Sequence, residues 1–473
     1  MVLTYSKYLK RIVSAVILFG MVILIFGRYA EIARYPRTGL YDFYNKIEKD
    51  TVDVLCVGSS HVYCSINPVQ MYDDYGIAAY DLSAGSQAIW YSYYFILEAL
   101  KTQKPDVVIL DVYTVIEPDG YFDKKIEGNL LNMKPSYTKY EALRAADADD
   151  IASILFEFPI THSRYKQLQK EDYSIRKNNG FFLGYLYETR IVPYSKEQIT
   201  DVRGGVEMDP ISRKAEEYLR KTIERMKKDE IDLILVNAPW PNITEGAQKK
   251  YNYVQKIADE YGIPFLNGCL YTEEIGLDYT VDSMGDGGHL NYTGAAKYTR
   301  WLCNYLKENY ELPDRRIDDR YAVWQQESEK LNALMRKNNL ATIDNIYEYV
   351  SNIQSDEIYY VITMDGNNGE EGNDICEFLS TNGIDIQQDG ICVMNGNKEV
   401  FCHKGEDTYQ YYQYFGDSVL YVYEEEDKNI VLWNDRVHAV VENGFNIFAY
   451  DCLLDEVIAT VGFDADNGYI AVR

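Results

Sequence analysis

Two short stretches of the chain carry side chains that could perform nucleophilic catalysis. In the first, an apolar run ends at Gly58 and two serines follow, the second of which is Ser60. In the second, far downstream, Asp286 stands shortly before His289. A serine hydroxyl is a weak nucleophile at neutral pH, so it needs an adjacent base such as His289, whose imidazole Asp286 could orient. We therefore expect Ser60, Asp286 and His289 to form a catalytic triad, with Asp282 as the alternative carboxylate.

The two stretches together resemble the SGNH (GDSL) hydrolase superfamily. Gly58-Ser59-Ser60 is similar to the first block of that family, and Asp286-Gly-Gly-His289 is similar to its last block. The continuation His289-Leu-Asn-Tyr-Thr-Gly294 resembles the membrane-anchored branch that modifies cell-surface polymers, which includes DltD-like and alginate O-acetylation-like proteins. The resemblance covers roughly residues 50–310 and implies an SGNH-type, flavodoxin-like parallel sheet with helices on both faces. It implies acyl transfer without any cofactor.

The resemblance also assigns the groups that would hold the oxyanion of a tetrahedral intermediate. These are the backbone amides of Ser60 and Gly85, although Gly85 is equally well explained as part of an ordinary strand-to-helix turn. The family's third block would place an asparagine where this chain has Asp111-Val-Tyr113-Thr114. The third donor, typically worth ~3 kcal/mol of barrier, is therefore missing or is supplied by Tyr113 or Thr114.

Three further side chains are candidates for contacts with the substrate. His61 adjoins the nucleophile, and Tyr113 and Asn237 each come just after a predicted buried strand. In parallel sheets of this kind, ligands bind at the carboxyl ends of the strands. We expect these residues to shape the site, with the ring of His61 pointing away from Ser60.

The first two thirds of the chain alternate buried apolar runs with helical segments. Strands are predicted at 53–57, 78–82, 106–112, 231–236 and 264–266, and helices from residue 67 and at 90–103, 212–228, 246–261 and 292–309. This alternation favours a parallel sheet with helices on both faces. Residues 118–210 are aromatic and charged, so we expect an irregular insertion over the site, with a helix at 147–156.

The composition restricts the partners of the protein. A net charge of −27 argues against nucleic acid and against electrostatic docking on anionic lipid. The cysteines include no C-x-x-C pair, so the common zinc and thioredoxin-type motifs are excluded and we expect no metal site. Cys376, Cys392, Cys402 and Cys452 could form disulfides in an exported protein, in a pairing that the sequence leaves open.

The start of the chain predicts a membrane anchor. A short basic segment precedes an apolar run at 12–27, which Leu9 and flanking basic side chains can extend to the length of a span. No small-residue cleavage site directly follows the run, so we favour an uncleaved signal anchor over a cleaved signal peptide. The expected location is the cell membrane, with a single pass and the bulk of the chain outside the cytoplasm.

The expected domains are the anchor at 1–30, an SGNH-like domain at 31–312, a charged linker at 313–345 and a β-rich domain at 346–473. In the last domain, strands are predicted at 358–364, 391–394, 418–423, 429–433, 444–451 and 456–463, and a helix at 372–381. The stretches Tyr359-Tyr-Val-Ile-Thr-Met-Asp-Gly and Gly444-Phe-Asn-Ile-Phe-Ala-Tyr-Asp451 resemble the ILEI/PANDER-like domain, a β-sandwich, in permuted order. That resemblance suggests attachment to glycans, and a structural or dimerising module is the equal alternative.

These observations predict a membrane-anchored, extracytoplasmic serine esterase or O-acyltransferase that works through an acyl-Ser60 intermediate. Its expected acceptor is a cell-surface polysaccharide or a teichoic-acid-type polymer, and a transferase would take its acyl group from an integral-membrane partner. The alternative is a catalytically inactive surface protein that binds glycan or scaffolds an acylation complex.

Overall fold

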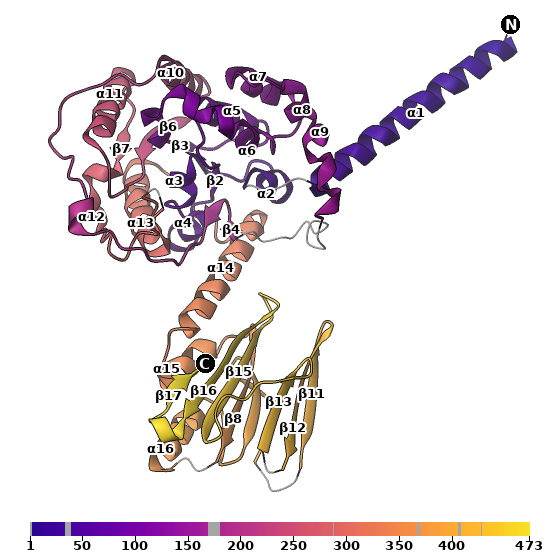
Figure 1. Ribbon diagram of the computed structural model, residues 1–473, viewed down its shortest axis with the longest axis vertical. Coiled ribbons are helices and arrows are strands. Elements are labelled where there is room, and N and C mark those ends of the chain that lie inside the picture. Colours follow the sequence, from indigo (N-terminus) through magenta and orange to yellow (C-terminus); the bar gives the residue numbers. More distant parts are fainter. Residues whose placement is uncertain are drawn as a thin grey trace. The chain divides into compact units, whose positions relative to one another are not determined.

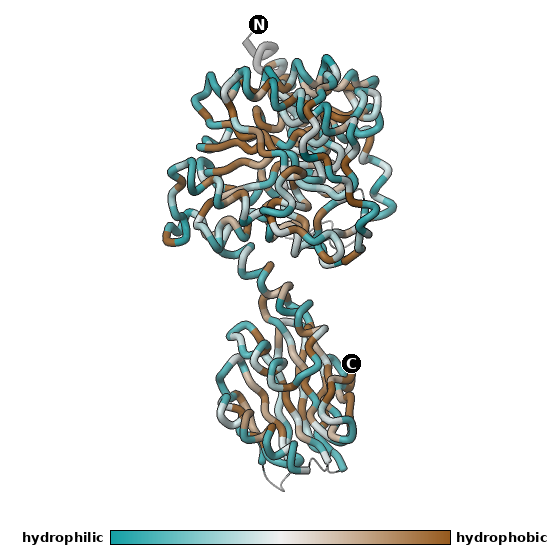
Figure 2. Tube along the Cα trace, turned by 90° about the vertical axis from the view of Figure 1, so that its left-hand side faces the viewer, coloured by the Kyte–Doolittle hydropathy of each residue, from teal (hydrophilic) through white to brown (hydrophobic). Residues whose placement is uncertain are grey.

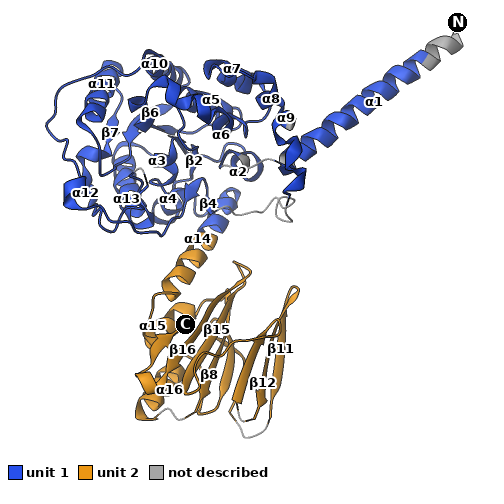
Figure 3. Ribbon diagram, viewed as in Figure 1, with its two compact units in different colours: residues 1–328 blue, residues 329–473 orange. Residues whose placement is uncertain are grey.

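The computed structural model of the protein describes residues 2–33, 39–168, 180–286, 288–366, 369–404, 408–426 and 428–473. The chain divides into two compact units, Met1–Ser328 and Glu329–Arg473, called here the N-terminal and the C-terminal unit (Figure 3). Apart from the exposed N-terminal helix, hydrophobic segments gather in the interior of each unit (Figure 2).

The N-terminal unit begins with helix α1 (Val2–Ala33), which contains the apolar run. Among the described residues, this is the helix that is long and apolar enough to cross a membrane, over Tyr8–Ala30 with a mean hydropathy of 2.3. A signal sequence has the same length and composition. The helix therefore fits a single span or a signal sequence.

A parallel sheet lies at the centre of the N-terminal unit, with its strands in the order β2-β1-β3-β6-β7. The strands are β1 (Val54–Gly58), β2 (Ala79–Ser83), β3 (Val107–Asp111), β6 (Asp232–Asn237) and β7 (Phe265–Asn267). The first three of these are buried throughout, as expected for strands that are covered on both faces. Renumbered along the chain, the order is 2-1-3-4-5, that of flavodoxin-like sheets, in which the winding reverses between β1 and β3. The predicted α/β architecture is confirmed.

Helices cover both faces of this sheet (Figure 1). On one face, α4 (Pro68–Tyr75) and α13 (Tyr292–Asn309) contribute Met71 and Leu302 to a core that includes alternate residues of the strands. On the other face, α5 (Ile89–Ala99) packs on α10 (Arg213–Lys228), while α11 (Glu245–Tyr261) packs against β7. Four of these helices, α4, α10, α11 and α13, begin at an N-cap residue whose side-chain oxygen accepts a hydrogen bond from a backbone amide of the first turn. The N-cap residues are Asn67, Ser212, Thr244 and Asn291.

The segment between β3 and α10 contains more helix than we predicted. Its described elements are η1 (Tyr113–Ile116), η2 (Asp119–Lys125), α6 (Ile126–Leu130), α7 (Tyr137–Ala145), α8 (Ile151–Phe156), α9 (Phe158–Thr161), η3 (His162–Lys166), β4 (Phe181–Phe182), β5 (Tyr185–Leu186) and η5 (Lys196–Gln198). The predicted helix at 147–156 is confirmed as α8, although it begins later, at Ile151. The prediction of an irregular insertion was wrong for the rest of 126–166, because short helices that begin at caps such as Ser136 show no long apolar period. Residues 169–179 of the predicted insertion lie outside the described part of the chain.

The chain leaves the α/β sheet close to the point where it enters it. Asp53 immediately precedes β1, and its carboxylate accepts hydrogen bonds from the guanidinium of Arg315, which follows α13, with 2.7 Å between Nη2 and Oδ1. The backbone amide of Arg315 also donates to the carbonyl of Gly76 just before β2. Entry and exit therefore meet at the edge of the sheet where the strands begin.

The segment interpreted as a linker is largely helical, because α14 (Ala322–Leu340) occupies most of it. The division between the two units falls within this helix. Its residue Trp324 is fully buried and donates from Nε1 to the carbonyl of Ala79 in β2, with 2.9 Å between nitrogen and oxygen.

The C-terminal unit consists of antiparallel sheets with the strand orders β10-β9-β8-β15-β16-β17 and β11-β12-β13-β14. The strands are β8 (Ile358–Asp365), β9 (Ile391–Asn395), β10 (Lys398–His403), β11 (Gln410–Phe415), β12 (Ser418–Glu425), β13 (Lys428–Trp433), β14 (Arg436–Val437), β15 (Gly444–Asp451), β16 (Glu456–Asp464) and β17 (Ile470–Val472). The predicted β domain is confirmed at this level, although β10, β11, β14 and β17 were not anticipated.

Buried side chains join these sheets face to face. Val361 and Phe448 of the larger sheet share a core with Leu420 and Val422 of the smaller one. Helices α15 (Ile346–Ile353) and α16 (Gly369–Thr381) contribute to a separate core with the larger sheet. A disulfide joins Cys392 to Cys402 across the β9–β10 hairpin, while Cys376 and Cys452 form none within the described residues.

Candidate active site

Ser60 lies at the reversal point of the sheet, where β1 ends. The Ser59 side chain caps a single helical turn, α3 (Ser60–Tyr63), by accepting a hydrogen bond from the backbone amide of His61. The turn passes so close to β3 that a Cβ on Gly58 would lie 2.5 Å from the Cβ of Asp111 and 2.7 Å from a methyl group of Val62. Glycine is therefore required at this position by a close approach of the backbone. Ligand sites of flavodoxin-like sheets lie at this reversal point.

His289 is held by the loop that enters α13. An isolated bridge pairs Ser283 with Leu290, and the amide of Met284 donates to the carbonyl of His289. Asn291 caps α13 through its side chain. Contacts of residues before and after His289 in the sequence thus fix the position of its imidazole.

The alternative carboxylate, Asp282, serves this loop rather than the imidazole. It is fully buried and accepts hydrogen bonds from Lys297 Nζ at 2.6 Å, from Thr293 Oγ1 at 2.9 Å and from the backbone amide of Asp278 at 2.7 Å. These bonds attach the loop to the first turns of α13 and leave Asp282 committed to the structure of the loop.

The structure brings Ser60, His289 and Asp286 together. The distance between Ser60 Oγ and His289 Nε2 is 2.8 Å, which is that of a hydrogen bond. On the other side of the ring, Nδ1 lies 3.3 Å from Asp286 Oδ1 and also contacts the backbone carbonyl of Asp286. With Nδ1 donating, Nε2 is left free to accept the hydroxyl proton of Ser60, as a general base must.

Asp286 is more exposed than the carboxylate of a buried triad. Its side chain is 57% exposed and lies 3.5 Å from the guanidinium of Arg190, which also pairs with Glu188 at 3.2 Å. Because exposed ion pairs are screened by water, this carboxylate stabilises an imidazolium weakly. The carbonyl of the same residue supplies a second acceptor that orients His289. Arg190 was not anticipated from the sequence.

An aromatic cluster formed by His61, Tyr113 and Trp240 packs against His289. The ring of His61 stacks on Tyr113, with 3.6 Å between centroids, and lies 4.6 Å from the ring of His289. Trp240, from the loop after β6, meets Tyr113 edge to face at 5.4 Å. The one-turn helix α3 turns the side chain of His61 toward the loop that carries His289. That its ring points away from the hydroxyl of Ser60 stays a prediction.

Burial determines the protonation state of His61 in this cluster. His61 is fully buried, and its Nδ1 has no hydrogen-bond partner among the described residues. Burial, and secondarily the neighbouring His289, holds the pKa of His61 well below its ordinary value. His61 is therefore a neutral ring at physiological pH, and its contact with His289 carries no charge repulsion.

Asp111 occupies the position where the family would supply an asparagine-containing block. It is buried, and its Oδ2 accepts a hydrogen bond from Ser59 Oγ at 3.1 Å. Burial raises the pKa of Asp111 to about 7. Asp111 therefore supports the cap of the turn that carries Ser60.

Gly85 and Tyr63 lie near Ser60 at the carboxyl ends of β1 and β2. The register pairs Gly58 with Ser83, so Ser60 and Gly85 each stand two residues beyond the last pair of β1 and β2. Gly85 is exposed, and a Cβ built on it would lie 3.7 Å from Tyr63 Oη. The Tyr63 phenol interacts with the Ser60 side chain, and burial raises its pKa, so the hydroxyl keeps its proton. Tyr63 follows Ser60 by three residues, which in a helical turn places the two side chains on the same face. This spacing in the sequence could have predicted the contact.

Two other residues that we predicted to lie in the site, Asn237 and Thr114, make hydrogen bonds outside it. Asn237 is buried and donates from Nδ2 to Asn267 Oδ1 at 2.9 Å, within a network that continues to Gln248. Thr114 is buried and donates from Oγ1 to the carbonyl of Gln87 at 3.0 Å. The structure does not bring either of these side chains into contact with Ser60 or His289. Both stabilise loops at the carboxyl edge of the sheet.

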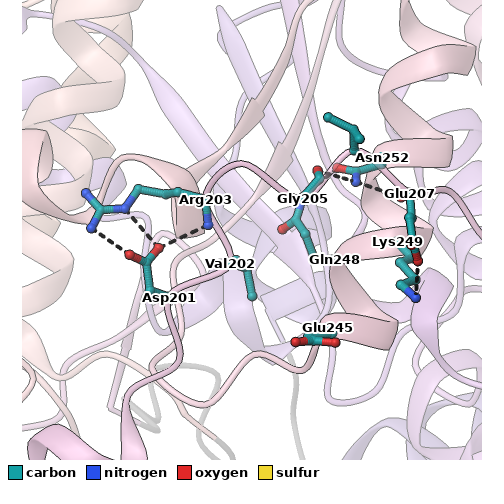
Figure 4. Close-up of a pocket in the computed structure, with 10 residues that line it drawn as sticks. Asp201, Val202, Arg203, Gly205, Glu207, Glu245, Gln248, Lys249 and Asn252 are labelled. Carbon is teal, nitrogen blue, oxygen red and sulfur yellow. Dashed lines mark hydrogen bonds and ion pairs between the residues drawn. The ribbon is translucent and has the colours of Figure 1, made fainter.

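Other features of the surface do not coincide with this site. A cavity of about 480 Å³ lies between the 201–207 segment and α11 (Figure 4), and its charged side chains largely pair with one another, as Arg203 does with Asp201 and Lys249 with Glu207. In the described part of the chain, no group of three or more His, Cys, Asp or Glu side chains could hold a metal ion.

Comparison with known proteins adds no assignment, since the chain matches no protein-family model and no curated protein sequence.

Proposed function

We propose that the protein is a membrane-anchored, extracytoplasmic serine hydrolase of the SGNH type that transfers or hydrolyses ester-linked acyl groups. The observation that carries the proposal is the 2.8 Å hydrogen bond between Ser60 Oγ and His289 Nε2 at the reversal point of a flavodoxin-like sheet. Nucleophile and base lie within direct reach, and the base has acceptors on its far nitrogen.

In the first half-reaction, Ser60 Oγ attacks the carbonyl carbon of the acyl donor while His289 Nε2 takes the hydroxyl proton. The resulting oxyanion accepts hydrogen bonds from the backbone amides of Ser60 and Gly85. When the tetrahedral intermediate collapses, the bond to the leaving alcohol breaks, and His289 returns its proton to that oxygen. An acyl-Ser60 ester remains.

In the second half-reaction, a hydroxyl group attacks the acyl-Ser60 ester, and His289 again takes and returns the proton. Water as the attacking group makes the protein an esterase, whereas a sugar or polymer hydroxyl makes it an O-acyltransferase. The apolar helix α1 favours transfer, because an enzyme anchored in the membrane can take acyl groups from an integral-membrane donor and pass them to a surface polysaccharide or teichoic-acid-like acceptor. The chemistry uses no cofactor.

The test is covalent labelling of the detergent-solubilised full chain with a serine-directed fluorophosphonate, followed by intact-mass measurement. A single adduct is expected on the native chain and none on Ser60→Ala. Ser59→Ala is the matched control: its hydroxyl bonds to Asp111 instead of a histidine, so its loss should leave an adduct. An adduct that persists in Ser60→Ala, or no adduct on the native chain, would contradict the proposal.

A second candidate function, a glycan-binding or scaffolding surface protein, is favoured by one face of the smaller sheet in the C-terminal unit. Tyr412 and Tyr414 of β11 are 61% and 66% exposed, and Tyr421 stands opposite Tyr412 in the register of β12. The rings of Tyr421 and Tyr423 stack at 4.9 Å on the same face. A solvent face of a sheet normally carries polar side chains, so this tyrosine face is a candidate docking surface.

Binding of a soluble polysaccharide to the full chain, measured for the native protein, Ser60→Ala and the double variant Tyr412→Ala/Tyr414→Ala, separates the two functions. A scaffold would keep binding in Ser60→Ala and lose it in the tyrosine variant, with no fluorophosphonate adduct on any chain. Labelled Ser60 with no effect of the tyrosine substitutions would reject the second candidate.

A further inference from the structure

One segment of the N-terminal unit packs against the end of the apolar helix. Tyr29 Oη donates to the carbonyl of His162 at 2.8 Å, and the guanidinium of Arg164 donates to the carbonyl of Ile32 at 3.3 Å. Ala30 and Ala33 of α1 are buried. The last turn of α1 is therefore attached to the segment formed by α8, α9 and η3, residues 151–166.

The position of this attachment along α1 is informative. The apolar stretch Tyr8–Ala30 has 23 residues, which at 1.5 Å per residue is about 34 Å of helix, slightly more than the ~30 Å hydrocarbon core of a bilayer. If α1 spans the membrane, residues 29–33 stand at the level of the lipid headgroups. A segment that is hydrogen-bonded to them stands at the same level.

The side chains that this segment exposes suit that environment. Phe156, the last residue of α8, is 65% exposed, and Tyr165 in η3 is 60% exposed. Lys166 lies over the ring of Tyr165, with 5.6 Å from Nζ to the ring centroid. Aromatic rings with an adjacent basic group are typical of the membrane interface, where one end of the side chain is apolar and the other is wet.

The corner that presents Phe156 is rigidly supported. Glu157, between α8 and α9, has a φ of +61°, a left-handed conformation that non-glycine residues adopt only when their surroundings hold them. Its carboxylate is buried and pairs with the buried ammonium of Lys139 in α7 at 3.1 Å. A buried ion pair at a strained residue fixes the corner, so the exposed ring of Phe156 is held outward by the fold.

We propose that the segment 151–166 is a membrane-contact surface, with Phe156 and Tyr165 seated among the lipid headgroups beside α1. The inference rests on the proposed anchoring by α1 and goes beyond it, because an anchor alone leaves the rest of the unit free in water. The contact is driven by apolar burial and aromatic anchoring, so it does not need anionic lipid.

The experiment uses the full chain in nanodiscs of zwitterionic phosphatidylcholine, with one copy of the protein in each disc. Nitroxide labels are attached in turn to Phe156→Cys, Tyr165→Cys, Leu24→Cys and Tyr137→Cys. All are made in a background in which the exposed Cys452 and the partly exposed Cys376 are replaced by serine. Collision with oxygen and with a water-soluble nickel complex reports the depth of each label. Tyr137 in α7, which is 76% exposed, is the matched aqueous control.

We expect the labels at 156 and 165 to collide with the nickel complex at least about threefold less than the label at 137, as groups at the membrane interface do. The label at Leu24 should be fully protected. Protection at 24 with aqueous labels at 156 and 165 would overturn the membrane-contact surface and leave the anchor in place. An aqueous label at 24 would overturn the anchor as well, so the failures of the two proposals are distinguishable.

Adding phosphatidylglycerol to the discs distinguishes aromatic anchoring from attraction to the charge of the headgroups. Unchanged depth at 156 and 165 is the expected result for aromatic anchoring. Protection that appears only with phosphatidylglycerol would overturn the proposed apolar contact in favour of headgroup charge, for which Lys166 is the nearest candidate.

Discussion

The imidazole of His61 lies 4.6 Å from the imidazole of His289, with Tyr113 stacked on it at 3.6 Å. A buried neutral histidine therefore supports the ring that we propose as the general base. This relationship, together with the buried Asp111 below the same turn, makes the pH dependence of stability a direct probe of the site.

Replacement of His61 by phenylalanine should make the protein more stable in acid. The pKa of folded His61 is lowered by burial, so below the ordinary pKa of 6.5 the unfolded chain binds a proton that the folded chain does not. His61 therefore contributes a loss of up to ~1.4 kcal/mol per pH unit as the pH falls through this range, and this contribution is absent from His61→Phe. Urea unfolding of the detergent-solubilised chain at pH 7.5 and 5 measures the difference. The same change in stability between pH 7.5 and 5 in both chains would show that His61 is accessible to protons.

Asp111→Asn should change the pH dependence in the opposite sense. The pKa of Asp111 is raised to about 7 by burial, so between its ordinary value of 3.8 and 7 the folded chain holds a proton that the unfolded chain has released. Asp111 therefore contributes a loss of stability as the pH rises through this window, by about 4 kcal/mol in total, and this contribution is flat above it. The variant should lack this slope. The same unfolding measurements, extended to pH 8, test this, and an unchanged slope would contradict it.

Substitutions in the triad should differ in severity. Ser60→Ala and His289→Ala should each lower the rate of ester cleavage or acyl transfer by about 10⁴-fold or more, because nucleophile and base act as a unit. Asp286→Asn should cost only about 10–100-fold, since its carboxylate is exposed and the carbonyl of the same residue also holds Nδ1 of His289. Steady-state kinetics on one activated ester compares them. A loss in Asp286→Asn as large as in Ser60→Ala would mean that the carboxylate is shielded from water in the working enzyme.

Gly58→Ala should damage the turn that carries the nucleophile. The added methyl group would overlap the Cβ of Asp111 at 2.5 Å and Val62 at 2.7 Å, so β3 or α3 must move, at a cost of about 1–3 kcal/mol or more. Gly128→Ala in α6, where nothing lies within 4 Å of the added Cβ, is the matched control and should be neutral or stabilising. Thermal unfolding and fluorophosphonate labelling of both variants provide the comparison. A fully labelled, fully stable Gly58→Ala chain would refute the close approach.

Loss of the Cys392–Cys402 disulfide should weaken the C-terminal unit. The bond closes a loop of separation 10 in the chain, for which the loop-entropy estimate is about 3 kcal/mol. The variant Cys392→Ser/Cys402→Ser should unfold at lower urea concentration when followed by signals from this unit. Reduction of the native chain should produce the same shift, and reduction of the variant should produce none.

The strands of the α/β sheet were predictable because strands that are buried on both faces consist mainly of consecutive apolar residues. Each of β1, β3 and β6 contains four consecutive apolar residues, and the predicted bounds differ from those observed by about one residue. The same holds for α13, whose cap Asn291 and apolar period are both local. The juxtaposition of Ser60 and His289 followed from the pairing of two motifs.

Features that depend on tertiary packing were not predictable. His61 faces His289 because α3 is a single turn, and the sequence records only that the residue adjoins Ser60. Arg190 reaches Asp286 from an insertion with no apolar period. In the C-terminal unit, β11 alternates tyrosines with other polar or aromatic residues on both faces, so its pattern lacks the contrast that marks a half-buried strand.

The contact between Asp53 and Arg315 has a consequence for how such a protein can be assembled from parts. The chain enters and leaves the α/β sheet at one corner, at the edge where the strands begin, while Ser60 and Gly85 stand beyond the opposite edge. Additions at either end of this framework therefore join it away from the proposed catalytic residues. The framework can be joined to other leading and trailing segments without redesign of the turn that carries Ser60, provided that the buried contact of Trp324 with Ala79 is kept.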